Sequence, residues 1–227
     1  LYLDLTSQEL YGLWLTLGAI LGWIKVGDMG IGLSLTRRAI GALESNNYAL
    51  LRSYVAASIG ITLAFGTVIS TFGYYLTDLL VNLLSVDESF QDSFKDSYHI
   101  LLVVACIRPS CGIFSSIINA KQHIAFLHIK NTIVSLVTIF FTLLLMFFEF
   151  GITAFAYALL GEALMTLVID VCYVKYIDKD ISILPLKSSR KDIRNLLDFG
   201  APYQALKVAN LVSTSTDNII IAAVMGA

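Results

Sequence analysis

The chain has 227 residues, of which 57% are hydrophobic and only 14% are charged, and its formal net charge is −2. Soluble domains carry about 25% charged residues, so this composition excludes a soluble globular protein and predicts an all-α polytopic membrane protein. The net charge says little, because the distribution of charge matters more than its sum, and no nucleic-acid partner is expected.

The first apolar segment runs from Tyr11 to Thr36, contains only two charged residues, Lys25 and Asp28, and is followed by Arg37 and Arg38. As a helix, its 26 residues extend over about 39 Å, which exceeds the ~30 Å hydrocarbon core of a bilayer. The segment is therefore predicted to span the membrane as one helix that ends at the arginine pair.

Lys25 and Asp28 lie deep in this predicted helix. Lys25 is about 18 Å from the arginine pair, and Asp28 is three positions further on, on the same helical face. A charge at this depth costs at least ~2.5 kcal/mol, so each side chain needs a partner or water. Two interpretations are open: the residues neutralise each other, or they line a functional cavity. The second is favoured, because charges inside a membrane mark functional sites by default.

Five further apolar spans follow. Three lie at about residues 49–84, 98–119 and 132–148, the next follows the turn near residue 150 and ends at about residue 174, and the last lies at 196–227. Pro109, next to Arg108, predicts a kink because it lacks a backbone donor and clashes with the preceding helical turn. The short turn at Glu149 and Gly151 predicts an antiparallel helical hairpin. The chain begins without Met and stops on an apolar segment, so we expect a fragment of a longer protein.

The expected organisation has three parts. Residues 1–174 hold five spans, residues 175–195 form a polar loop between two bundles, and residues 196–227 hold the sixth span. Eleven Lys and Arg residues, including Lys121 and Lys130, fall in alternate connections between spans, whereas Lys95 stands alone on the opposite side. The positive-inside rule therefore predicts that the basic loops are cytoplasmic, with Arg37, Arg38 and Arg194 as anchors.

The sequence contains no catalytic motif of the HExxH, P-loop or GxSxG type, and its three cysteines lack metal-ligand spacing. We therefore predict that the chain is not an enzyme and binds neither a metal nor a cofactor. Seven charged residues instead lie within the predicted spans: Lys25, Asp28, Arg108, Glu162, Asp170, Lys207 and Asp217.

These charges differ in predicted depth. Asp170 and Asp217 lie near span ends, where they are expected to snorkel or to cap a helix. Glu162 is deeper and is a predicted partner of Arg108 or Lys25.

Lys25, Arg108 and Lys207 all fall near mid-depth. If they converge, they form a cationic cavity suited to an anionic group such as a phosphate. Periodicity does not decide whether they converge.

The first span opens and closes with short motifs formed by Tyr11, Gly12 and Trp14, then Asp28, Gly30 and Gly32, then Leu35, Thr36 and Arg37. The last span carries Gly200 and Pro202 near its start and Asp217, Ile220 and Gly226 near its end. These patterns resemble the second and seventh helices of polysaccharide flippases in the MATE-like exporter superfamily. The resemblance implies a MATE-like helical bundle of which this fragment holds about six transmembrane helices, helices 2–7.

The resemblance also implies a function. Such a transporter moves a polyprenyl-pyrophosphate-linked oligosaccharide, an O-antigen of lipopolysaccharide, a capsule unit or an exopolysaccharide unit, to the outer leaflet of the inner (plasma) membrane by alternating access. Membrane lipids and other glycan-assembly membrane proteins are its further expected partners. Lys25, Arg108 and Lys207 are the candidate substrate-binding cations by depth. If H⁺ or Na⁺ drives the cycle, Asp28 and Glu162 are the deepest carboxylates available.

Three other functions are considered. A multidrug or metabolite exporter of the same architecture would favour an acidic, aromatic cavity for cationic compounds, which a cation-rich lining disfavours. A membrane glycan polymerase or acyltransferase would carry a catalytic motif in a large outer loop, whereas the longest predicted outer loop is short and acidic. A structural membrane subunit is the third.

Overall fold

The computed structural model describes residues 30–84, 86–179, 181 and 188–225, and beyond Ala209 it describes the backbone only. These residues form helices joined by short connections. The elements in chain order are α3 (Ile31–Glu44), α4 (Tyr48–Tyr75), α5 (Thr77–Leu83), the 3₁₀ turn η2 (Glu88–Phe90), α6 (Gln91–Ala120), α7 (Ile124–Phe147), α8 (Thr153–Ile177) and α9 (Arg190–Met225).

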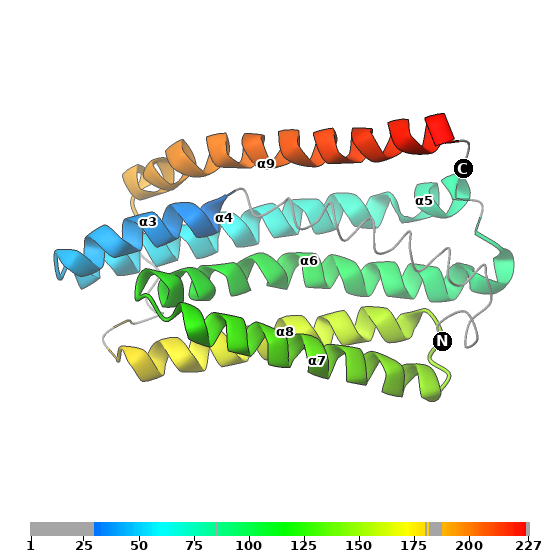
Figure 1. Cartoon of the computed structure of the whole chain (residues 1–227), viewed down its shortest axis with the longest axis horizontal. Coiled ribbons are helices and arrows are strands. Elements are labelled where there is room, and N and C mark those ends of the chain that lie inside the picture. The colour runs from blue at the N-terminus through cyan, green and yellow to red at the C-terminus, as the bar shows by residue number, and fades with distance from the viewer. Residues whose placement is uncertain (1–29, 85, 180, 182–187, 226–227) are drawn as a thin grey trace.

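The long helices run side by side, with α6 in the middle of the bundle (Figure 1). On one side α6 packs against α3 and α4, which in turn contact α9; on the other it packs against α8, which carries α7. The α3–α4, α6–α7 and α8–α9 connections all lie at one end, which we call the basic end (Figure 1). The α7–α8 turn, α5 and η2 lie at the opposite end.

Four of the six predicted spans are confirmed as helices long and apolar enough to cross a membrane: Tyr48–Tyr75, Glu88–Ala120, Ile124–Phe147 and Thr153–Ile177. Most of the first predicted span lies outside the described residues. The last corresponds to α9, although its side chains beyond Ala209 lie outside them as well.

Burial separates the two faces of these helices. Small residues on α8, including Ala154, Ala156 and Ala163, are buried and let it approach α6 closely. In contrast, α7 exposes large apolar side chains such as Ile133, Phe140 and Phe147, the last of them 84% exposed. This outer face of α7 suits contact with lipid.

The first predicted helix differs from the observed one at both of its described points. Gly30 has a left-handed backbone with φ of 64°, and α3 begins after it at Ile31, so the segment is not one continuous helix. At the other end α3 passes the arginine pair and continues to Glu44. Charged residues mark where a helix leaves the membrane, and the helix itself can continue into water.

Three other boundaries also differ from prediction. The span 49–84 is divided at Leu76 into α4 and α5, where the Thr77 hydroxyl donates to the Tyr74 carbonyl. The third helix begins at Gln91 rather than near residue 98, because the acidic segment predicted as a loop forms η2 and the first turns of α6. The fourth begins at Ile124, because the connection before it is only three residues long. This last difference places Lys130 inside α7.

The hairpin of α7 and α8 is confirmed. Its turn is closed by Glu149 and Gly151, which both adopt positive φ values, of 62° and 57°. α6 contains Pro109 and remains helical on both sides of it; the kink at this position stays a prediction.

Candidate site in a polar cavity between α6, α7 and α8

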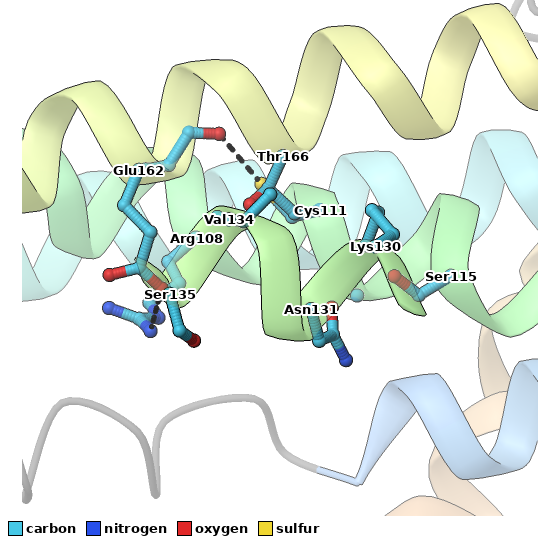
Figure 2. Close-up of a pocket in the computed structure, with 11 residues that line it drawn as sticks. Arg108, Cys111, Ser115, Lys130, Asn131, Val134, Ser135, Glu162 and Thr166 are labelled. Carbon is cyan, nitrogen blue, oxygen red and sulfur yellow. Dashed lines mark hydrogen bonds and ion pairs between the residues drawn. The ribbon is translucent and has the colours of Figure 1, made fainter. Parts of the chain in front are cut away.

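Arg108 and Glu162 form an ion pair between α6 and α8. An Nη atom of Arg108 lies 2.9 Å from Oε1 of Glu162, and the side chains are 30% and 21% exposed (Figure 2). Arg108 precedes the end of α6 by about 18 Å, and Glu162 precedes the end of α8 by about 22 Å, so the pair lies at mid-depth of both helices. The predicted pairing of Glu162 with Arg108 is thus confirmed, whereas the alternative partner Lys25 lies outside the described residues.

A second ion pair joins α7 to α8. The Lys130 ammonium group lies 2.7 and 2.8 Å from the two carboxylate oxygens of Asp170, and both side chains are almost fully buried. The Ser115 hydroxyl, from α6, donates a 2.7 Å hydrogen bond to the same carboxylate. One carboxylate therefore ties three helices together, and each of its oxygens accepts at least one hydrogen bond.

This second pair corrects two predictions. Asp170 neither snorkels nor caps a helix, and Lys130 does not lie in a connection. The α7–α8 turn is centred near residue 150, so both residues lie twenty positions from it and face each other across the hairpin. The equal spacing of Lys130 and Asp170 from the turn can be counted in the sequence. It predicts that they meet only when the boundaries of both helices are known.

A cavity of about 390 Å³ opens beside these pairs. Its polar lining comes from all three helices: Arg108 and Ser115 from α6; Lys130, Asn131 and Ser135 from α7; Glu162 and Thr166 from α8 (Figure 2). The Cys111 thiol also lines it and donates to the Ala163 carbonyl at 3.4 Å. The hydroxyl and amide groups can hydrogen-bond water or a small polar ligand.

The two pairs differ in how readily they open. Arg108 and Glu162 both reach the cavity, where water or a ligand can replace either partner. Lys130 borders the cavity, but its side chain and that of Asp170 are almost fully buried. Separating them leaves a buried charge without compensation, which costs about 3–5 kcal/mol. The site thus contains a partly exposed ion pair, Arg108–Glu162, and next to it a buried ion pair, Lys130–Asp170.

The remaining predicted site residues do not join this cavity in the part of the chain that the structure describes. Lys25 and Asp28 lie outside the described residues. Lys207 lies on α9 with its ammonium group 5.7 Å from the centre of the Tyr203 ring, and α9 packs against α3 and α4. The convergence of Lys25, Arg108 and Lys207 therefore stays a prediction.

Within the described ranges, no group of three or more His, Cys, Asp or Glu side chains could hold a metal ion. The predicted anchors Arg37, Arg38 and Arg194 lie toward the basic end of the bundle, on α3 and α9.

The packed helices, four of them long and apolar enough to cross a membrane, define a multi-pass membrane protein, and comparison with solved structures identifies its fold as MATE-like. The chain superposes with a TM-score of 0.78 on a MATE protein crystallised in complex with MaD3S, at 14% identity, covering 96% of this chain and 50% of that one. An inward-facing multidrug resistance MATE family transporter of the MOP superfamily gives a TM-score of 0.67 at 16% identity, covering 86% and 45%. The chain thus spans about half the length of these proteins.

A family model described as polysaccharide biosynthesis protein matches residues 61–227, and the chain belongs to this family. No curated protein sequence matches the chain. The family and the fold agree with the resemblance found in the sequence motifs.

Proposed function

We propose that the full-length protein is a transporter that moves a polyprenyl-pyrophosphate-linked oligosaccharide, such as an O-antigen, capsule or exopolysaccharide unit, across the inner membrane. The observation that carries this proposal is the match of a polysaccharide-biosynthesis family to a chain with an exporter fold. Glycan units assembled on a lipid carrier inside the cell need such a protein, because their sugars and pyrophosphate cannot cross the hydrocarbon core unaided. The basic end is then cytoplasmic.

The charge pair at mid-depth supports a transport role. Arg108 is the described cation best placed to meet an anionic head group, since it reaches the cavity and its guanidinium can form bidentate hydrogen bonds to phosphate oxygens. In the absence of substrate, Glu162 neutralises Arg108. When a pyrophosphate binds Arg108, Glu162 is released and becomes free to bind H⁺ or Na⁺. Exchange of partners on Arg108 would therefore couple substrate to ion.

The proposal is tested by complementation. The complete parent gene is expressed in a bacterial strain that lacks its own flippase, and surface polysaccharide is measured at matched protein levels. Restored polysaccharide that disappears in Arg108→Ala supports both the function and the role of Arg108. The same loss is expected in Lys25→Ala if Lys25 belongs to the site. Failure to restore surface polysaccharide with several glycan types, despite normal membrane insertion, would overturn the proposal.

A multidrug or metabolite exporter is the second candidate. The cavity favours it in one respect: each cation of the described lining, Arg108 and Lys130, is paired with a carboxylate, so the lining is not strongly cationic. Export of cationic dyes from cells that express the complete protein, without any gain in surface polysaccharide, would select this function.

A further inference from the structure

The two sequence motifs at opposite ends of the chain meet each other at the basic half of the bundle. Gly30 and Ser34 belong to the first motif region, and Gly200 follows Leu196 at the start of the last span. In the structure α3 and α9 pack together here and run in opposite directions (Figure 1). Contacts between these two helices therefore join the first bundle to the first helix of the second.

The closest approach is between backbones. A Cβ atom added to Gly30 would lie 2.5 Å from the Gly200 carbonyl oxygen, so no side chain fits between the helices at this point. Gly30 also has a φ of +64°, a left-handed conformation that other residues rarely adopt. The glycine is thus needed twice, for its backbone conformation and for the absence of a side chain.

One helical turn further along, the contact becomes a hydrogen bond. The Ser34 hydroxyl donates to the Leu196 carbonyl at 2.8 Å, and both residues are completely buried. A further turn along α3, a guanidinium nitrogen of Arg38 donates to the Asn195 carbonyl at 3.2 Å. The three residues are four positions apart, with Gly30 at the N-cap of α3 and Ser34 and Arg38 within the helix, so the contacts lie on one side of α3 over about 12 Å.

The chemistry of this stripe suits a contact that opens and closes. On α9 the contacting groups are the backbone at Gly200 and two backbone carbonyls. On the other side they are the N-cap glycine of α3, a hydroxyl and a guanidinium. Each of these polar groups can hydrogen-bond water instead when the helices separate, so opening leaves no polar group unsatisfied. At these three contacts α9 provides only backbone atoms, and beside them the Phe199 ring of α9 adds a side-chain contact, its centre 4.8 Å from the guanidinium of Arg37.

We propose that Gly30, Ser34 and Arg38 form a latch on the backbone of α9 that closes the transporter at its cytoplasmic side and releases when the protein opens inward. The proposal rests on the proposed alternating-access function, because only then do the two bundles separate at this end. It gives the glycine motif of the first span a physical role: the motif provides the close approach that seals the pathway.

The test measures access to the latch in the full-length protein. In a cysteine-free background, Leu196→Cys places a thiol at a completely buried position of the latch, where the backbone carbonyl accepts the hydrogen bond from Ser34 and the side chain packs in the apolar core. Everted membrane vesicles then expose the cytoplasmic face to a membrane-impermeant maleimide, and the labelling rate reports how often the latch opens. Substrate is not needed for this readout.

Ser34→Ala should raise the labelling rate about fivefold, since one buried hydrogen bond is lost from the closed state only. Gly30→Ala should raise it further, because its methyl group cannot fit against Gly200. Arg194→Ala is the matched control for Arg38→Ala: it removes the same charge at the same end, but its described partner is Asp198 on its own helix. Arg38→Ala should therefore increase labelling, and Arg194→Ala should leave it unchanged.

Equal labelling rates in the Ser34→Ala, Gly30→Ala and unaltered proteins would overturn the latch, and so would an equal increase in Arg194→Ala. If Gly30→Ala fails to insert, Ser34→Ala decides, because it removes a single hydroxyl group. Surface polysaccharide measured in the same strains separates the two proposals. The expected labelling pattern without glycan export would leave the latch standing and remove the flippase assignment, whereas export without any labelling change would do the reverse.

Discussion

Lys130 and Asp170 lie the same number of residues from the α7–α8 turn and form the most deeply buried ion pair of the described chain, 3% and 0% exposed. The Ser115 hydroxyl donates a further hydrogen bond to the Asp170 carboxylate of this pair. The pair joins α6, α7 and α8 below the cavity and so fixes the positions of Arg108 and Glu162. We assign it a structural role, which leads to the first prediction.

Lys130→Met should destabilise the protein by about 3–5 kcal/mol, because it leaves the Asp170 carboxylate buried without its cation. The double variant Lys130→Met/Asp170→Leu should recover most of this loss, since an apolar pair of similar size has no charge to desolvate. Thermal unfolding in detergent measures both. A double variant as unstable as the single one would show that the charges do more than compensate each other.

Ser115→Ala is a milder change at the same carboxylate. Asp170 keeps its two hydrogen bonds to Lys130 and loses one, so we expect a destabilisation of about 1–2 kcal/mol with transport retained. Ser135→Ala, which alters the cavity lining on α7, is the comparison and should have less effect on stability. Loss of export in Ser115→Ala at normal stability would instead place Ser115 in the transport site.

The Arg108–Glu162 pair should respond differently, because both side chains reach the cavity. We expect Glu162→Gln to insert normally and to lose or weaken the dependence of transport on the ion gradient. Arg108→Lys should reduce transport less than Arg108→Ala, since lysine keeps the charge but not the fork of donors. Glycan export is measured in each variant with and without a protonophore, and with and without sodium. The comparison distinguishes a loss of ion coupling from a loss of transport. Unchanged gradient dependence in Glu162→Gln would transfer the coupling role to another carboxylate such as Asp28.

Asp192 gives a prediction for pH. It lies in the first turn of α9, before the apolar span, where its carboxylate accepts hydrogen bonds from Ser53 on α4 and from Ser189 at the helix start. Burial raises the pKa of Asp192, but the hydrogen bonds from Ser53 and Ser189 outweigh it and bring the pKa below its usual value. A carboxyl whose pKa is lower in the folded state stabilises that state above the unfolded pKa of about 3.9 and stops doing so as the pH falls through the folded value.

Asp192→Asn should therefore lower the Tm at pH 7. The difference from the unaltered protein should shrink as the pH falls below about 4, because the unfolded carboxyl is protonated first, and it should vanish only below the lower pKa of the folded state. Asp198→Asn, which changes an exposed carboxylate on the same helix, is the control and should have a smaller effect. A Tm difference for Asp192→Asn that is constant from pH 7 to pH 3.5 would exclude this role for the Asp192 charge.

The sequence predicted some contacts within the membrane and missed others. Arg108 and Glu162 were predictable as partners because both are charged residues at a similar depth in the membrane, where a charge needs an opposite charge or water. Lys130 was predicted to lie in a connection because the segment around it, KQHIAFLHIKN, contains several polar residues. Eight residues assigned to that connection belong to α7, and this shift alone moves Lys130 from the surface into the bundle.

The sequence by itself determined that this is a helical membrane protein, where four of its spans lie, that a hairpin turns at Glu149 and Gly151, and to which family it belongs. These properties follow from apolar length, turn residues and local motifs, which act within one segment. Only the tertiary structure decided that Lys130 meets Asp170 and that Gly30 meets Gly200. Such contacts depend on the rotation and relative shift of two packed helices, and neither is fixed by the periodicity of one helix alone.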